Sequence, residues 1–214
     1  MINISELHSK GWTLVEGITS KAELLELGKS IGQPTLTPNG ELIKEIRRSS
    51  ISEAPKGSQS SLYGACRFPL HTDTVFWPTP TKYLILRGYG DCRRPTTVMS
   101  FENMIQKYDH DIQHLLQASV WRVSAGRHNF YCSLQFRQEN QFGWRYDSDL
   151  MLPANKPANE VNEILKQLVN SRDTDTITWS GSTAAILCNW ITLHGRGDEP
   201  PNEDERVIER LYVR

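Results

Sequence analysis

A series of short apolar runs separated by turn residues is the feature that most constrains the fold of this 214-residue chain. From about residue 82 onward the runs are only a few residues long, which is typical of β-strands. Many short strands with a few helices favour a sandwich or a jelly-roll barrel, although strand content alone fits other all-β folds as well. The expected strands are 11–15, 83–86, 96–99, 119–123, 130–136, 176–179, 184–188 and 207–213.

Three helices are expected between and before these strands. The first begins at Ser20-Lys21-Ala22-Glu23, a capping box in which the serine oxygen accepts an early amide and the glutamate reaches back. The others are residues 101–117 and about 159–170, where apolar residues recur at intervals of three and four. Residues 49–62, rich in serine and glycine, are expected to form a loop. We therefore predict a mainly β fold with peripheral helices (α+β), in a single domain spanning 1–214.

The composition excludes several classes of protein. The net charge is −1 and the pI about 6.6, without the concentrated basic face that binding to nucleic acid needs. No apolar stretch approaches the roughly 20 residues of a membrane span, and the first residues show no secretory signal. The four cysteines form no C-x-x-C pair, so we expect reduced thiols in a cytoplasmic protein.

Two motifs place candidate metal ligands in the chain. His71 and Asp73 are two residues apart, and on an extended segment such side chains point to the same face. A third candidate, His194, lies far away on a second strand-like segment. Two histidines and one carboxylate on a β scaffold are the facial triad of non-haem iron(II) enzymes, which leaves three metal positions for small molecules. The sequence therefore predicts Fe(II) bound by these three residues.

Arg206 and Arg210 follow the second histidine motif and share a face if their segment is a strand. A dicarboxylic co-substrate such as 2-oxoglutarate can chelate iron with one end, and its buried far carboxylate then needs a paired cation. An arginine fork provides this with two parallel hydrogen bonds.

With these residues in place, the sequence resembles the taurine dioxygenase and clavaminate synthase-like family of Fe(II)/2-oxoglutarate-dependent oxygenases. The matching segments span most of the chain in the family's order. They are 68–73, 80–86, 189–196 and Arg206-x-x-x-Arg210. The resemblance implies a double-stranded β-helix, the cupin-like jelly-roll barrel, with an N-terminal helix region of about 1–60 and a metal-binding core of about 61–214.

The resemblance also implies roles for individual residues. His71, Asp73 and His194 correspond to the iron ligands, and Arg206 to the arginine that pairs with the distal carboxylate of 2-oxoglutarate. Thr96 corresponds to a threonine that assists the same carboxylate, although Arg93-Arg94 stand where the family often has two glycines. Arg210 corresponds to a contact to an anionic group of the substrate.

The reaction implied is hydroxylation of an unactivated C–H bond with O₂, in which 2-oxoglutarate becomes succinate and CO₂. The expected substrate is a small anionic molecule, such as an amino acid or a natural-product intermediate. Two alternatives remain open at this stage. One is a cupin-type metal enzyme that does not use 2-oxoglutarate, and the other is a jelly-roll module that binds a ligand without catalysis.

Overall fold

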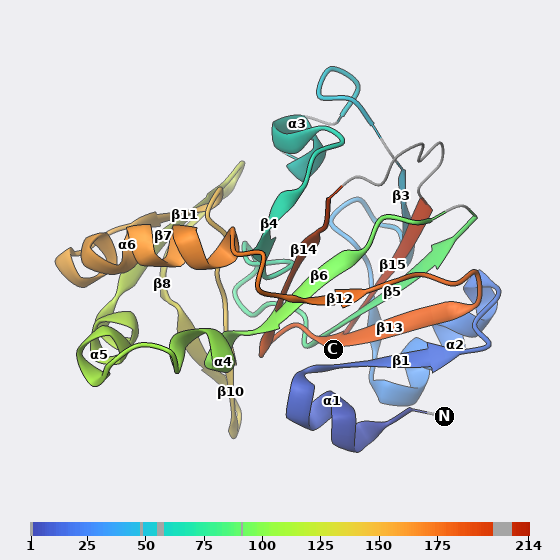
Figure 1. Cartoon of the computed structure of the whole chain (residues 1–214), viewed down its shortest axis with the longest axis horizontal. Helices are drawn as coiled ribbons and strands as arrows, with labels where there is room; N and C mark the ends of the chain where they lie inside the picture. Colours follow the sequence, from blue (N-terminus) through green and yellow to red (C-terminus); the bar gives the residue numbers. More distant parts are fainter. Residues whose placement is uncertain (1, 48, 55–57, 91, 199–206) are drawn as a thin grey trace.

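A computed structural model describes residues 2–47, 49–54, 58–90, 92–198 and 207–214. The protein is mainly β, with two larger antiparallel sheets at its centre and helices around them (Figure 1). The expectation of a mainly β fold with peripheral helices is therefore confirmed.

The larger sheet has six strands, all paired antiparallel. Its order is β1-β13-β5-β15-β2, with β3 also paired to β15. The strands are β1 (Trp12–Glu16), β13 (Thr183–Cys188), β5 (Tyr83–Tyr89), β15 (Val207–Val213), β2 (Pro34–Thr35) and β3 (Ile43–Arg47). Because β1, β2 and β3 come from the N-terminal region, that region completes the sheet as well as adding helices.

A four-stranded sheet lies against the larger one, and its order is β12-β6-β14-β4. The strands are β12 (Asp175–Ile177), β6 (Thr96–Ser100), β14 (Thr192–Arg196) and β4 (Phe68–His71). One buried apolar cluster contains side chains of both sheets, including Leu84 and Leu187 from the larger sheet and Val98 and Ile177 from the smaller. Burial of this shared cluster holds the two sheets face to face.

The chain between β6 and β12 forms a further layer (Figure 1), whose apolar cluster also includes Leu70 of β4 and Leu193 of β14. It contains the three-stranded sheet β11-β7-β8 and the hairpin β9-β10. The elements are α4 (Phe101–Ile105), α5 (His110–Ala118), β7 (Val120–Ala125), β8 (His128–Ser133), β9 (Gln135–Gln138), β10 (Gln141–Trp144), β11 (Met151–Pro153) and α6 (Lys156–Val169). The predicted third helix is α6, which starts three residues earlier than expected because Asn155 caps it.

Two local predictions are corrected by the structure. The single helix expected over 101–117 is two helices, because the Asp109 side chain accepts a hydrogen bond from the Ile112 amide and starts α5 afresh. The strand expected over 130–136 is divided between β8 and β9 at Leu134, which is fully buried.

The N-terminal helices are α1 (Ile4–Lys10) and α2 (Lys21–Ile31), and the capping box predicted at Ser20 is present. Glycine at position 28 lets α2 approach the larger sheet, since a Cβ there would lie 2.5 Å from the Leu211 side chain. The loop expected over 49–62 contains the short helix α3 (Gln59–Tyr63), which Ser58 caps. None of the α3 side chains is buried, which explains the absence of an apolar sequence pattern.

No helix in the described part of the chain is long and apolar enough to cross a membrane. Cys66, Cys132 and Cys188 form no disulfide in the described part of the chain.

Candidate metal centre

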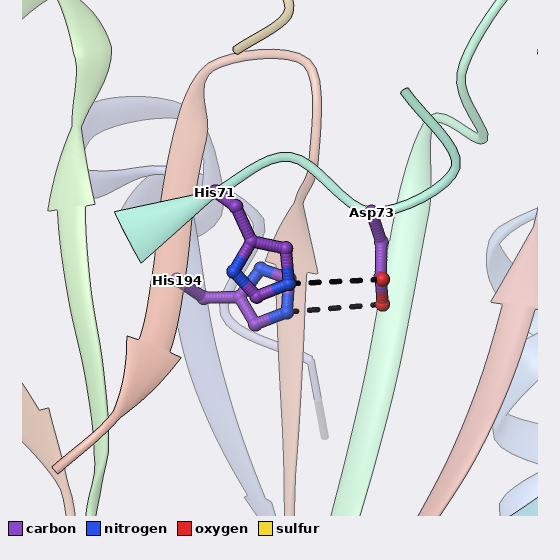
Figure 2. Close-up of side chains that lie close together, drawn as sticks. All are labelled: His71, Asp73 and His194. Carbon is purple, nitrogen blue, oxygen red and sulfur yellow. Dashed lines mark ion pairs between the residues drawn. The ribbon is translucent and has the colours of Figure 1, made fainter. Parts of the chain in front are cut away.

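His71 and His194 are direct neighbours across two strands of the four-stranded sheet. β4 and β14 pair antiparallel with His194 opposite His71, so both side chains leave the same face of the sheet. Their ring centroids are 4.5 Å apart. Asp73 lies just beyond β4, in a turn that begins after Thr72, rather than on a continuous extended segment as predicted. The turn still directs its carboxylate towards the two imidazoles (Figure 2).

The donor atoms of these three side chains converge. The Nε2 atom of His71 lies 3.9 Å from Asp73 Oδ1, and that of His194 lies 3.7 Å from Asp73 Oδ2 (Figure 2). The potential ligand atoms all lie within 4.8 Å of one another, and all three residues are buried. Among the described residues, this is the one group of three or more such side chains that could hold a metal ion. The structure therefore brings together the three predicted metal ligands.

The His71 ring is oriented to present a lone pair to this point, and the His194 ring is neutral. The Nδ1 atom of His71 lies 3.1 Å from the Pro69 carbonyl oxygen, which can only accept, so in the neutral ring the proton is on Nδ1 and Nε2 is bare. Burial, together with the nearby His71, lowers the pKa of His194 to about 3, so this ring is neutral at physiological pH. Neutral imidazole is the form that coordinates metal ions.

Asp73 is held as a carboxylate by the Arg210 guanidinium beside it. Burial alone would raise the pKa of Asp73, but Arg210 above all reverses the effect, so its pKa lies below the usual value. The Arg210 Nη1 atom donates to both carboxylate oxygens, at 3.1 Å to Oδ2 and 3.3 Å to Oδ1. Hydrogen bonding from the Tyr212 hydroxyl lowers the pKa further. The donor set is thus two neutral nitrogens and one anionic oxygen, which suits a divalent metal of the iron type.

Asn189 fixes the backbone that carries Asp73. Its Oδ1 atom accepts from the Asp73 amide at 2.9 Å, and its Nδ2 atom donates to the Asp73 carbonyl at 3.0 Å and to the Thr81 carbonyl at 2.9 Å. The side chain is 1% exposed, so water does not compete for these bonds. The sequence assigned Asn189 no role beyond its place in the matching segment 189–196. Its position five residues before His194 was the available signal.

The layer between β6 and β12 also contacts the metal motif. The Thr72 amide donates to the Tyr146 carbonyl at 2.8 Å, and the Tyr146 amide donates to the Thr72 hydroxyl at 3.1 Å. The next residue, Asp147, is buried, and burial raises the pKa of its carboxyl, an effect that the nearby His71 partly offsets. Sequence reasoning missed Asp147, because an acid in a turn carries no pattern that marks it as buried.

The remaining predicted residues have different outcomes. Thr96 is buried on β6, and it shares a face with Val98, whose partner across the sheet is His194. Thr96 therefore points to the same side of the sheet as the metal ligands. Arg210 contacts Asp73 with Nη1, whereas its buried Nε atom has no hydrogen-bond partner among the described residues. Arg206 lies outside the described residues.

No protein-family model and no curated protein matches the sequence. Solved structures do match it. Asparagine oxygenase (AsnO) gives a TM-score of 0.74 at 16% identity, covering 98% of this chain and 76% of that protein. The non-haem iron oxygenase OrfP, in complex with Fe and α-ketoglutaric acid, gives a TM-score of 0.74 at 16% identity, covering 98% of this chain and 77% of OrfP. PvcB from Pseudomonas aeruginosa gives 0.71 at 17% identity, with coverage of 98% and 77%.

The chain has the fold of these iron oxygenases. The resemblance to the taurine dioxygenase and clavaminate synthase-like group is therefore confirmed at the level of the fold. At 16–17% identity the likeness concerns the oxygenase fold alone, so the assignment of chemistry depends on the side chains described above.

Proposed function

We propose that this protein is an Fe(II)- and 2-oxoglutarate-dependent dioxygenase that hydroxylates a C–H bond of a small anionic substrate, such as an amino acid. The observation that carries the proposal is the convergence of His71, Asp73 and His194 donor atoms within 4.8 Å, on the fold of iron oxygenases. The neighbours support the substrate class. One AsnO structure contains Fe(II), 3-hydroxyasparagine and succinate, and one OrfP structure contains Fe, succinate and 3-hydroxyarginine.

The strand order supports a double-stranded β-helix, the jelly-roll arrangement, within one domain of residues 1–214. Successive strands alternate between the two facing sheets: β3 and β5 are in the larger sheet, whereas β4 and β6 are in the smaller. The same alternation repeats in β12, β13, β14 and β15. Two such windings, one after the other, are what a jelly roll requires.

Different residues of the chain would bind the metal, the co-substrate and the substrate. His71, His194 and Asp73 would hold Fe(II), which, with bound 2-oxoglutarate, supplies the activation of O₂ that C–H hydroxylation requires. Arg206 would pair with the distal carboxylate of 2-oxoglutarate, and the Thr96 hydroxyl would assist it. Arg210 would position an anionic group of the substrate, since its Nη1 atom is engaged by Asp73 while its buried Nε donor has no described partner. The free thiols suit the reducing cytoplasm, which we propose as its compartment.

Anaerobic titration of the protein with Fe(II) and then 2-oxoglutarate tests this function. The expected result is a weak visible charge-transfer band that needs both additions. A folded protein that binds Fe(II) but never develops the band would contradict the use of 2-oxoglutarate. One that does not bind Fe(II) at all would contradict the metal site.

The variant Arg206→Ala separates the proposal from a cupin-type enzyme without 2-oxoglutarate. We expect Fe(II) binding to persist and 2-oxoglutarate binding to be lost, because the distal carboxylate would remain buried without a cation. Unchanged turnover in this variant would favour the cupin-type alternative. Arg122→Ala, at an exposed position on β7, is the matched control and should behave as the wild type.

A further inference from the structure

A hollow in the molecule lies outside the group of metal ligands. It has a volume of about 680 Å³, and its lining includes Trp77, Trp190, Lys82, Arg214 and Glu139. None of the three metal ligands lines it. A volume of this size lies within the range of ligand pockets, and its mixture of aromatic and charged side chains is that of a site for a small organic molecule.

The cavity carries more positive than negative charge. Lys82 and Arg214 line it, and neither forms an ion pair with any described residue. Each instead lies over an indole: Lys82 Nζ is 5.6 Å from the Trp190 ring centroid, and the Arg214 guanidinium is 5.2 Å from that of Trp77. A cation on an aromatic face keeps its outer side available for an anion. Among the described residues, Glu139 is the one acid in the lining.

The walls of the cavity are held in place before any ligand arrives. The buried Arg145 donates to the carbonyl oxygens of Trp77 at 3.1 Å and Pro78 at 2.7 Å, which fixes the loop that carries one wall. The Trp190 indole donates to the Pro80 carbonyl at 2.9 Å. The Thr79 hydroxyl donates to Gln138 at 3.2 Å and so joins this loop to the β9-β10 hairpin. A preformed wall lowers the entropy that a ligand loses on binding.

We propose that this cavity binds a small aromatic carboxylate. Its carboxylate is paired by Lys82 and Arg214, and its planar body packs against Trp77 and Trp190. The excess of cations selects an anion, and the two indoles select an apolar, planar body. The site does not include the metal ligands but is linked to them through one side chain, because the Trp77 ring contacts the buried ring of Tyr212, whose hydroxyl interacts with Asp73.

The test is an NMR titration of the metal-free protein with 3-phenylpropanoate, observing the indole N–H signals of the six tryptophans. Trp77→Phe and Trp190→Phe assign the two relevant signals. We expect these two signals to shift saturably, in the millimolar range for a ligand of this size. The neutral analogue 3-phenylpropanamide should bind about tenfold more weakly, because it has no charge to pair. Absence of saturable shifts, or equal binding of the two compounds, would overturn the proposal.

Charge-removing variants locate the carboxylate. Lys82→Gln and Arg214→Gln should each weaken 3-phenylpropanoate binding by about threefold, as expected for a partly exposed ion pair. Arg137→Gln is the matched control, because Arg137 is an exposed cation that lies over Phe142 on the same hairpin but does not line the cavity. Wild-type affinity in both Lys82→Gln and Arg214→Gln would contradict the assignment. Because no metal is needed, the result does not depend on the function proposed for the iron site.

Discussion

Two arginine–carboxylate pairs lie on opposite faces of β15, at adjacent residues: Arg87–Glu209 is buried, whereas in Arg210–Asp73 the arginine is half-buried. Glu209 faces Arg87, whose Nε and Nη2 atoms lie 2.7 and 2.6 Å from the same carboxylate oxygen. Arg210, on the other face, contacts Asp73 with one nitrogen at 3.1 and 3.3 Å. The first pair is a closed unit of two charges. In the second, two imidazole nitrogens also point at the carboxylate without bonding to it.

The difference shows how an ion pair with a structural role can be distinguished from one at a functional site. In the first pair, a single carboxylate oxygen receives two short contacts from one arginine. In the second, Asp73 stands beside imidazole nitrogens whose lone pairs a cation would satisfy, and the buried Nε donor of Arg210 has no hydrogen-bond partner among the described residues. Each pair matches one arginine with one carboxylate, so the unfilled bonding capacity identifies the functional one.

The largest difference between the two pairs is expected when the charge of each carboxylate is removed in turn. Asp73→Asn should lower Fe(II) affinity by more than about 100-fold, since even residues behind the metal ligands contribute 10- to 100-fold. Glu209→Gln should leave Fe(II) affinity unchanged. Anaerobic calorimetric titration with Fe(II) measures both. Equal losses in the two variants would mean that Asp73 does not contact the metal.

Variants of the Arg87–Glu209 pair should change the stability of the fold instead of the Fe(II) affinity. Arg87→Met leaves Glu209 buried without a partner and should lower the free energy of unfolding by about 3–5 kcal/mol. The double variant Arg87→Met/Glu209→Met should recover most of that loss, because no buried charge remains. Urea denaturation provides the values. A change in Fe(II) affinity in the folded double variant would show that the two faces of β15 are coupled.

Asn189→Ala tests whether the backbone of Asp73 must be fixed. We expect Fe(II) affinity to fall about 10- to 100-fold, because the carboxylate loses its orientation. Asn155→Ala is the control, since Asn155 also bonds to several backbone groups, at Val120, Ala118 and Ala158, but far along the chain from the metal ligands. It should lose stability and keep Fe(II) affinity. The same affinity loss in both variants would indicate a general folding effect.

The smallest effect is expected for Asp147, and it concerns how the stability of the protein depends on pH. Burial raises its pKa above the ordinary 3.8, so the native state keeps a proton that the unfolded state releases. Its stabilising contribution is therefore complete below pH 3.8 and is lost as pH rises through the native pKa. Relative to Asp147→Asn, the wild type should become less stable between about pH 4 and neutrality, as measured by thermal unfolding across that range. A pH-independent difference would contradict the shift.

Much of the site could be predicted from the sequence because local spacing carries it. His71 and Asp73 are close in the chain, and His194 stands on an apolar run that reads as a strand. The contacts of Asn189 with Asp73 could not be predicted, since they join residues 116 positions apart and depend on how β13 leads into β14. The contact of Arg210 with Asp73 could not be predicted either, since it joins residues 137 positions apart.

A similar share of the fold could be predicted from the sequence. Strand-like runs located β5, β6, β13 and β15, and the capping box located α2. The break between α4 and α5 was missed because the apolar spacing continues across it, while a single aspartate side chain interrupts the helix. The assignment of Arg206, the division into an N-terminal region and a core, and the role of Thr96 remain predictions.

The pairing of His71 with His194 across β4 and β14 makes the site sensitive to alignment. In a sheet, sliding one strand by a single residue turns its side chains to the opposite face, so insertion or deletion of one residue in β14 would separate the imidazoles completely. Substitutions on the same strand would leave the two imidazoles facing each other. During refolding, the metal could therefore bind only after these distant segments have paired in the correct register.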